Sequence, residues 1–214
     1  MEANVKKNNI KKQLKVILLG ESGVGKTNII SRYVNDLFLA KSLSTIGSTY
    51  IEKELKRNNI TYKLHIWDTS GQERYHSITK LFLQNSDIVL LVYSIDSNQS
   101  FTNLDYWYKE VTNLCGNNFI LGIAGNKYDL FDDDDSIKRV PDEEGEKYAE
   151  EKKAIFKLIS AKQDKKGIDS LFDELLDEYI TKNYSNINER NENDKINIQN
   201  KHNIKGQKKK KKFC

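Results

Sequence analysis

A glycine-rich segment directly after a buried strand constrains the fold more than any other feature of this sequence. Residues 20–27 read Gly-Glu-Ser-Gly-Val-Gly-Lys-Thr and match the pattern GxxxxGK[ST]. A nearly continuous apolar run, 14–19, precedes the segment, and a helical stretch over 26–35 follows it. Glycines let the backbone turn tightly enough for successive N–H groups to face phosphate oxygens at a helix N-terminus. The strand, turn and helix together predict a phosphate-binding loop (P-loop).

The side chains of this loop have the chemistry that a bound phosphate chain and its metal require. Lys26 can reach the outer phosphates, and the hydroxyl of Thr27 can coordinate Mg²⁺. A chance match in a lysine-rich chain is the alternative, and the flanking strand and helix argue against it. We therefore assign to nucleotide binding Glu21, Ser22, Gly23, Val24, Gly25, Lys26, Thr27 and Asn28.

Apolar runs that alternate with helical repeats predict an α/β fold. Strands are expected at 14–19, 50–57, 60–67, 87–93, 119–124 and 155–159, and helices at 26–35, 101–115 and 168–179. Asn58-Asn59 predicts an antiparallel hairpin between the second and third strands. Right-handed crossovers between the other strands give the P-loop NTPase fold, a six-stranded, mostly parallel sheet with helices on both faces.

Charge is distributed unevenly along the chain. Residues 183–214 carry nine Lys/Arg and three Asp/Glu, a local charge of +6, so the other 182 residues sum to −2. We expect a disordered leader over 1–13, one domain over 14–182 and a disordered basic tail over 183–214. A mildly acidic domain argues against nucleic-acid binding, and no apolar run approaches the roughly 20 residues of a membrane span.

Two further segments predict which base is bound. Asn126-Lys127-Tyr128-Asp129 and Ser160-Ala161-Lys162 each follow a predicted strand, at the edge of the sheet where such folds bind ligands. The Asp129 carboxylate can accept from two adjacent N–H donors of guanine, whereas adenine offers no such pair. The stem of Lys127 can pack along the base, Asn126 can join this loop to the P-loop, and the Ala161 N–H can donate to the guanine carbonyl. Guanine is therefore the predicted base.

A third segment predicts the hydrolytic chemistry. Asp68-Thr69-Ser70-Gly71-Gln72-Glu73 follows the predicted strand 60–67. Asp68 can hold Mg²⁺ through water, with Thr45 as a second hydroxyl for the metal, and the Gly71 N–H can reach a γ-phosphate. Gln72 is the candidate catalytic residue, which orients the attacking water. Because Thr45 and Gly71 both depend on the γ-phosphate, its loss is expected to release both segments.

These motifs together resemble the Ras superfamily of small GTPases over residues 14–182, and their details resemble the Rab branch. The Rab likeness depends on Ser44-Thr45-Ile46-Gly47, Ile66-Trp67-Asp68-Thr69 and Gly71-Gln72-Glu73-Arg74-Tyr75, and Tyr75-His76-Ser77 is most similar to the early-endosomal subgroup. The resemblance implies that Phe38 stacks on guanine. It also implies that Tyr50, Trp67 and Phe82 form an exposed triad for effectors, although such side chains are otherwise core or strand aromatics.

The resemblance further implies slow GTP hydrolysis with Mg²⁺, an exchange factor, a GTPase-activating protein, effectors, a prenylation escort and a GDP-dissociation inhibitor. Prenylation is expected at Cys214, and Lys208–Lys212 would add attraction to an anionic leaflet. The function implied is a vesicle-trafficking switch at the cytoplasmic face of an endomembrane, cycling with the cytosol.

The sequence departs from the family at Ser70, where the family has alanine, and at the polar run Ser48-Thr49-Tyr50. Two alternatives stay open: a GTP-binding scaffold that does not hydrolyse, and an adenine-specific P-loop kinase or ATPase.

Overall fold

Six strands pair into one sheet in the order β2-β3-β1-β4-β5-β6. The computed structural model describes residues 10–40, 45, 48–69, 81–133 and 139–184. The strands are β1 (Ile10–Leu19), β2 (Ser48–Arg57), β3 (Ile60–Thr69), β4 (Ile88–Ser94), β5 (Ile120–Asn126) and β6 (Ile155–Leu158). The β2–β3 pair is antiparallel, and the other four pairs of this sheet are parallel. The predicted fold class is confirmed.

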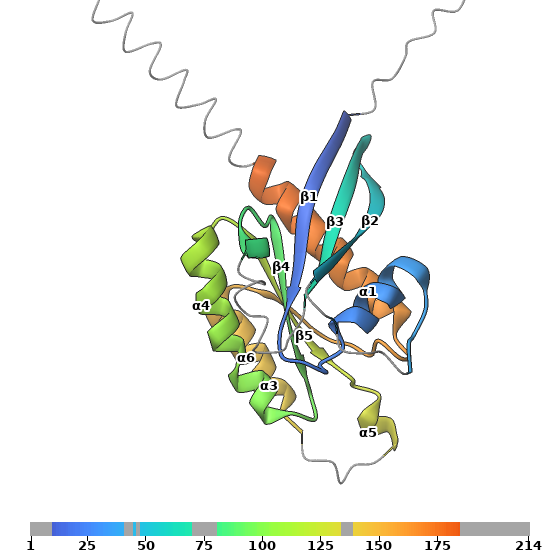
Figure 1. Ribbon diagram of the computed structural model, residues 1–214, viewed down its shortest axis with the longest axis vertical. Coiled ribbons are helices and arrows are strands. Elements are labelled where there is room, and N and C mark those ends of the chain that lie inside the picture. The colour runs from blue at the N-terminus through green and yellow to red at the C-terminus, as the bar shows by residue number, and fades with distance from the viewer. Residues whose placement is uncertain (1–9, 41–44, 46–47, 70–80, 134–138, 185–214) are drawn as a thin grey trace, which may run out of the picture. The chain divides into compact units, whose positions relative to one another are not determined.

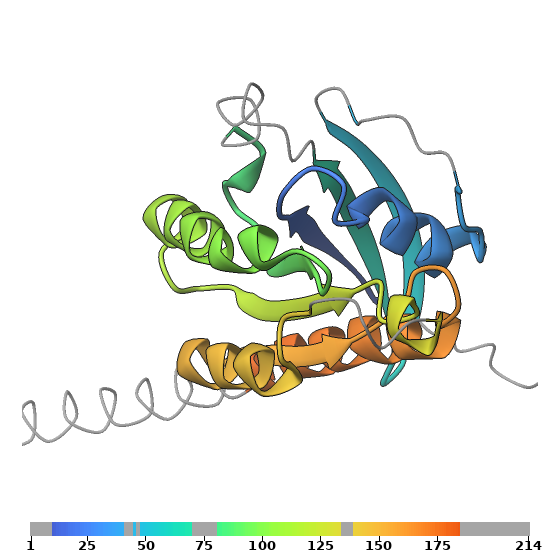
Figure 2. The same cartoon turned by 90° about the horizontal axis from the view of Figure 1, so that it is seen from below.

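Helices lie on both sides of the sheet. They are α1 (Lys26–Asn35), α3 (Asn98–Thr102), α4 (Leu104–Cys115), α5 (Leu130–Asp133) and α6 (Asp142–Lys152), followed by a helix over 165–184. Figures 1 and 2 show α1 and α4 on opposite sides. The chain divides into two units, 1–175 and 176–214, and every contact discussed below lies within the first. No helix in the described part of the chain is both long and apolar enough to cross a membrane.

The apolar run that precedes the P-loop is buried on both of its faces, as predicted. Val16, Ile17, Leu18 and Leu19 of β1 have no exposed surface. Ile17 and Leu19 belong to the core cluster that also contains α4 residues, Trp107 among them. Because successive side chains of a strand point to opposite faces, Val16 and Leu18 point to the other face, the one that α1 covers. Two helical layers therefore fix β1 and hold the loop at its end.

Several elements differ from the sequence prediction: α5 was not predicted, the last helix runs over 165–184 and not 168–179, and three further differences have clear causes. Strand β1 begins at Ile10, not at residue 14, because residues 10–13 continue the parallel ladder with β3 from Ile60 to Lys63. The helix predicted over 101–115 is two helices, with Asn103 as the C-cap of α3 and the N-cap of α4. Helix α6 was not predicted, because only Gly145 and Ala149 are buried on it and its apolar period is weak. Its signal was the acidic first turn after Pro141.

The carboxyl ends of the strands carry the predicted motifs. The P-loop follows the end of β1, and Asp68 lies at the end of β3. Asn126 is the last residue of β5, and the segment 160–162 follows β6. Asn58 and Asn59 have φ of 49° and 62°, as the predicted tight hairpin requires. The antiparallel hairpin thus returns the chain to the sheet so that β3 ends beside β1, which places Asp68 next to the P-loop.

Candidate functional site

The P-loop joins β1 to the first turn of α1. Gly25 is the N-cap of α1 and has φ of 100°, in the left-handed region that favours glycine. A Cβ atom at this position would collide with Nδ2 of Asn126. Since glycine has no side chain with which to bond the N–H groups of the first turn, these donors stay available to an anion. The loop can therefore bind phosphate through its backbone.

Lys26 is buried beneath the loop. Its side chain donates from Nζ to the carbonyl oxygens of Gly20 at 2.7 Å and Glu21 at 2.8 Å. The residue is only 5% exposed, and burial lowers the pKa of Lys26 to about 8, with Asp68 and Glu21 opposing the shift. A buried cation without a full counter-charge is stabilised by an anionic ligand, so phosphate binding will raise this pKa.

The lowered pKa of Lys26 predicts that nucleotide affinity depends on pH. Below pH 7 the amine is protonated whether or not nucleotide is bound, and this group contributes no pH dependence. Above about pH 8 the free protein has lost the proton that the complex retains. Binding then takes up a proton, and affinity should fall by up to about tenfold per pH unit.

The predicted pH dependence is tested by measuring GDP affinity from pH 7 to 9.5. Proton uptake is measured by calorimetry in buffers of different ionisation enthalpy. Lys26→Arg is the matched variant, because a guanidinium stays charged throughout that range. A wild-type profile as flat as that of the arginine variant would contradict the prediction.

Three oxygen ligands suited to Mg²⁺ meet beside Lys26. Oγ1 of Thr27 donates to Oδ2 of Asp68 at 2.7 Å and lies 3.1 Å from Oγ1 of Thr45. Burial raises the pKa of Asp68, partly offset by the hydrogen bond from Thr27 and the charge of Lys26. Oδ1 of Asp68 is buried and has no hydrogen-bond partner among the described residues. One carboxylate with two hydroxyls and a phosphate is an oxygen set of the kind that Mg²⁺ accepts.

The two predicted base-reading segments contact one another and the P-loop. Nδ2 of Asn126 donates to the carbonyl of Val24 at 2.8 Å, and Oδ1 of Asn126 accepts from the N–H of Ala161 at 3.0 Å. The predicted link from Asn126 to the P-loop is therefore present, whereas the Ala161 N–H that was expected to donate to guanine bonds to Asn126 in this structure. Oδ1 of Asp129 accepts from Oγ of Ser160 at 2.5 Å, and Oδ2 lies 3.5 Å from Nζ of Lys162. Asp129 is thus a buried, oriented carboxylate.

Lys127 lies between this loop and a neighbouring cavity. It has φ of 69°, and its Nζ is 3.9 Å from Oδ1 of Asp96. Glu21, Ser22, Gly23, Val24 and Lys127 line a cavity of about 290 Å³. Its other lining residues are Ser94, the last residue of β4, and residues that follow it. Glu21 also accepts from Nδ2 of Asn103 at 3.0 Å, a contact that was not predicted.

Asn28 contacts the backbone of the segment that carries Phe38. Its amide donates to the Leu39 carbonyl at 3.3 Å and accepts from the Leu39 N–H at 2.9 Å. Phe38 is 38% exposed between exposed Leu37 and Leu39. Asn28 therefore holds the backbone of this segment against α1. The P-loop motif alone did not predict this contact.

The predicted effector residues form a row of stacked rings. The ring centroids of Tyr50 and Trp67 are 5.5 Å apart, and those of Trp67 and Phe82 are 5.0 Å apart. Trp67 and Phe82 also pack against the core, whereas Tyr50 is half exposed. The three side chains are thus adjacent. The core interpretation holds in part for Trp67 and Phe82, and the surface interpretation holds for Tyr50.

Several predicted residues lie outside the described part of the chain. They are Ser70, Gly71, Gln72, Lys208–Lys212 and Cys214, together with the Rab-like residues 44, 46–47 and 73–77. Sequence reasoning in turn missed Arg32, which bonds to the 160–162 segment, because an arginine near the end of an amphipathic helix carries no motif signal.

Comparison with known proteins identifies relatives over most of the chain. The Ras family model matches residues 15–181. The Ras-like GTP-binding protein RYL2 of Yarrowia lipolytica is 36% identical over 171 residues, which cover 78% of this chain and 81% of that protein. Human Ras-related protein Rab-31 is 40% identical over 151 residues (71% and 75%), and Ras-related protein Rab-5A of Dictyostelium discoideum is 36% identical over 163 residues (76% and 79%).

Proposed function

The chain belongs to the Ras family, within its Rab branch, and on this premise we propose that it is a membrane-recruited switch in vesicle trafficking. Membership makes the protein a GTP-hydrolysing enzyme that binds GTP and GDP. Family members work with exchange factors, GTPase-activating proteins and effectors, and we expect the same classes of partner here. The specific partners, the membrane and the roles of single residues are the proposal.

The observation that carries the proposed nucleotide specificity is the contact of Asn126 with both the P-loop and the 160–162 segment. One side chain joins Val24 of the P-loop, which would bind the phosphates, to Ala161 of the segment that would bind the base. Asp129 is 5% exposed and is held from two sides by Ser160 and Lys162, so it presents an oriented acceptor that the two adjacent N–H donors of guanine can meet and that adenine, which lacks this donor pair, cannot. This supports GTP over ATP and weakens the adenine-specific alternative.

Switching is proposed to depend on Mg²⁺ and the γ-phosphate. Thr27, Thr45 and the unpartnered Oδ1 of Asp68 would hold the metal, which supplies charge neutralisation at the phosphates. Gly71 would donate to the γ-phosphate, and Gln72 would orient the attacking water. After hydrolysis Thr45 and Gly71 lose a shared partner, which releases the segments on which they lie.

Membrane recruitment is proposed to use the tail. Prenylated Cys214 would insert one lipid chain, which alone anchors weakly, and Lys208–Lys212 would supply the second attraction. A prenylation escort and a GDP-dissociation inhibitor would carry the lipid. The ring row of Tyr50, Trp67 and Phe82 would contact effectors. We propose the cytoplasmic face of an endomembrane, with the early endosome as the first compartment to examine.

Competition binding followed by single-turnover hydrolysis with Mg²⁺ tests the enzymatic part. We expect preference for GTP over ATP and slow hydrolysis by wild type and Ser70→Ala, with Gln72→Leu slower. Absence of hydrolysis in wild type, restored by Ser70→Ala, would favour the non-hydrolysing scaffold, and ATP preference would overturn the base assignment.

In cells, Cys214→Ser should move the protein from membranes to the cytosol. An unchanged distribution would contradict recruitment through this cysteine.

A further inference from the structure

Arg32 is a mostly buried arginine in the last turn of α1 that bonds to the segment 160–162. We infer that it is a positioning residue, which holds this segment in its base-reading conformation and thereby slows release of the nucleotide. The inference depends on the proposed function, because it assumes that the Ala161 N–H, which donates to Oδ1 of Asn126 in this structure, also meets the carbonyl of guanine when the nucleotide is bound. It concerns a side chain outside the motifs that identify the site.

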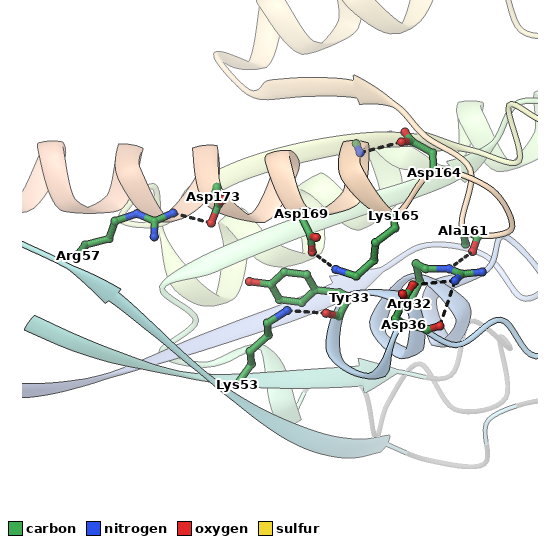
Figure 3. A network of polar contacts seen from close by, with 11 residues as sticks. Arg32, Tyr33, Asp36, Lys53, Arg57, Ala161, Asp164, Lys165, Asp169 and Asp173 are labelled. Carbon is green, nitrogen blue, oxygen red and sulfur yellow. Dashed lines mark hydrogen bonds and ion pairs between the residues drawn. The ribbon is translucent and has the colours of Figure 1, made fainter.

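The guanidinium of Arg32 makes four hydrogen bonds. Nε donates to the Ala161 carbonyl at 3.0 Å, and Nη2 donates to the Lys162 carbonyl at 2.9 Å. Nη1 donates to Asp36, at 2.8 Å to Oδ1 and 3.1 Å to the carbonyl oxygen. Figure 3 shows Arg32 between Ala161 and Asp36. Its side chain is 16% exposed as a whole; the bond from Nε to Ala161 is partly buried, whereas the bonds from Nη1 and Nη2 lie at exposed positions.

The bonds from Arg32 complete the support of the 160–162 segment. On one side Asn126 and Asp129 bond to the Ala161 N–H and the Ser160 hydroxyl. On the other side, Arg32 holds the two carbonyls that follow. Fixing successive peptide planes also fixes where the backbone N–H of this segment lies, because each peptide unit is rigid. Without Arg32, the segment would be anchored from one side only.

Helix α1 thereby links the two ends of the nucleotide site. Its first residues, Lys26 and Thr27, lie at the phosphate and metal end, and Asn28 holds the Leu39 backbone. Arg32, near the other end of the same helix, holds the base end. Since these contacts are separate, loss of Arg32 should loosen the base end and leave the Lys26 and Thr27 contacts intact.

An arginine in an ordinary structural ion pair, away from the 160–162 segment, provides the control. Arg57 pairs with Asp173 at 2.5 Å, at the opposite end of the view from Ala161 (Figure 3). Arg57→Gln is therefore the matched control for Arg32→Gln. Arg32→Lys is a second variant, because a single ammonium cannot reproduce the planar fork that meets two carbonyls.

The full chain, loaded with fluorescent GDP and Mg²⁺, is chased with excess GDP. Arg32→Gln should release the probe about ten- to hundredfold faster than wild type, less than the full effect of two charge-assisted hydrogen bonds because these bonds are partly exposed and act on the nucleotide through the segment, and Arg32→Lys should be intermediate. Arg57→Gln should release it at the wild-type rate. Single-turnover hydrolysis of GTP already bound should be unchanged in all three variants.

Competition by base analogues distinguishes a role of Arg32 in positioning the 160–162 segment from a general loosening of the nucleotide site. Arg32→Gln should weaken GDP and inosine diphosphate by similar factors, because both have the carbonyl at C6. It should weaken 2-aminopurine riboside diphosphate, which lacks this carbonyl, much less. Equal weakening of all three analogues, or a wild-type release rate for Arg32→Gln, would overturn the inference. Failure of the wild-type chain to retain fluorescent GDP would instead contradict the proposed function, and it is assessed before any variant is compared.

Discussion

Replacing Asp129 with asparagine should lower GDP affinity by roughly 10²- to 10⁴-fold. The carboxylate is proposed to accept both guanine donors, at N1 and at the 2-amino group, and each hydrogen bond to a charged group contributes about 1.5–3 kcal/mol. An asparagine amide keeps one acceptor but presents N–H donors toward the 2-amino group. The same variant should favour xanthosine diphosphate, since its carbonyl at C2 can accept from the new amide.

Equilibrium binding of GDP and xanthosine diphosphate to wild type and variant measures this exchange. The substitution preserves side-chain size, so an acceptor for the Ser160 hydroxyl stays in place. Asp173→Asn is the control, because Asp173 is also a carboxylate paired with a basic side chain but bonds to Arg57, away from the site. Wild-type GDP affinity in Asp129→Asn would show that this carboxylate does not read the base.

Asp129 also illustrates why the base-reading motif could be found from the sequence. Its role follows from the donors that guanine offers and from its place after a strand, two facts that do not depend on distant side chains. The P-loop is similar, since its glycines, Lys26 and Thr27 are contiguous in the chain. The strand that precedes it was recognisable because burial on both faces leaves an uninterrupted apolar run.

Features that depend on partners far along the chain were not predictable in this way. Arg32 lies 129 residues before Ala161, and Glu21 lies 82 residues before Asn103, so neither contact leaves a local pattern. The first residues of β1 resemble a polar leader because Lys11, Lys12 and Gln13 are polar, and their pairing with β3 is visible only in the sheet. Helix α6 lacked a strong apolar period for a related reason, because it lies at the surface and buries little.

The second large effect is expected at Lys26, where methionine keeps the apolar stem and removes the charge. Truncating one partner of a buried charge pair costs about 2–5 kcal/mol, so GDP affinity should fall on the order of 10²- to 10³-fold. The nucleotide-free protein should change much less in stability. In that state burial already lowers the pKa of Lys26 to about 8, which means that the desolvated charge is unfavourable before phosphate arrives.

Lys53→Met is the matched control for Lys26→Met. Lys53 also donates to a backbone carbonyl, that of Tyr33 at 2.5 Å, and burial also lowers the pKa of Lys53, but it lies away from the P-loop. We expect Lys53→Met to bind GDP as wild type does. Binding is measured by titration and stability by denaturant unfolding without nucleotide, so the two effects separate. If Lys26→Met lost stability and binding in parallel with Lys53→Met, Lys26 would be a structural lysine. A selective loss of binding would identify it as the residue that meets the phosphates, since the free fold tolerates its removal while the complex does not.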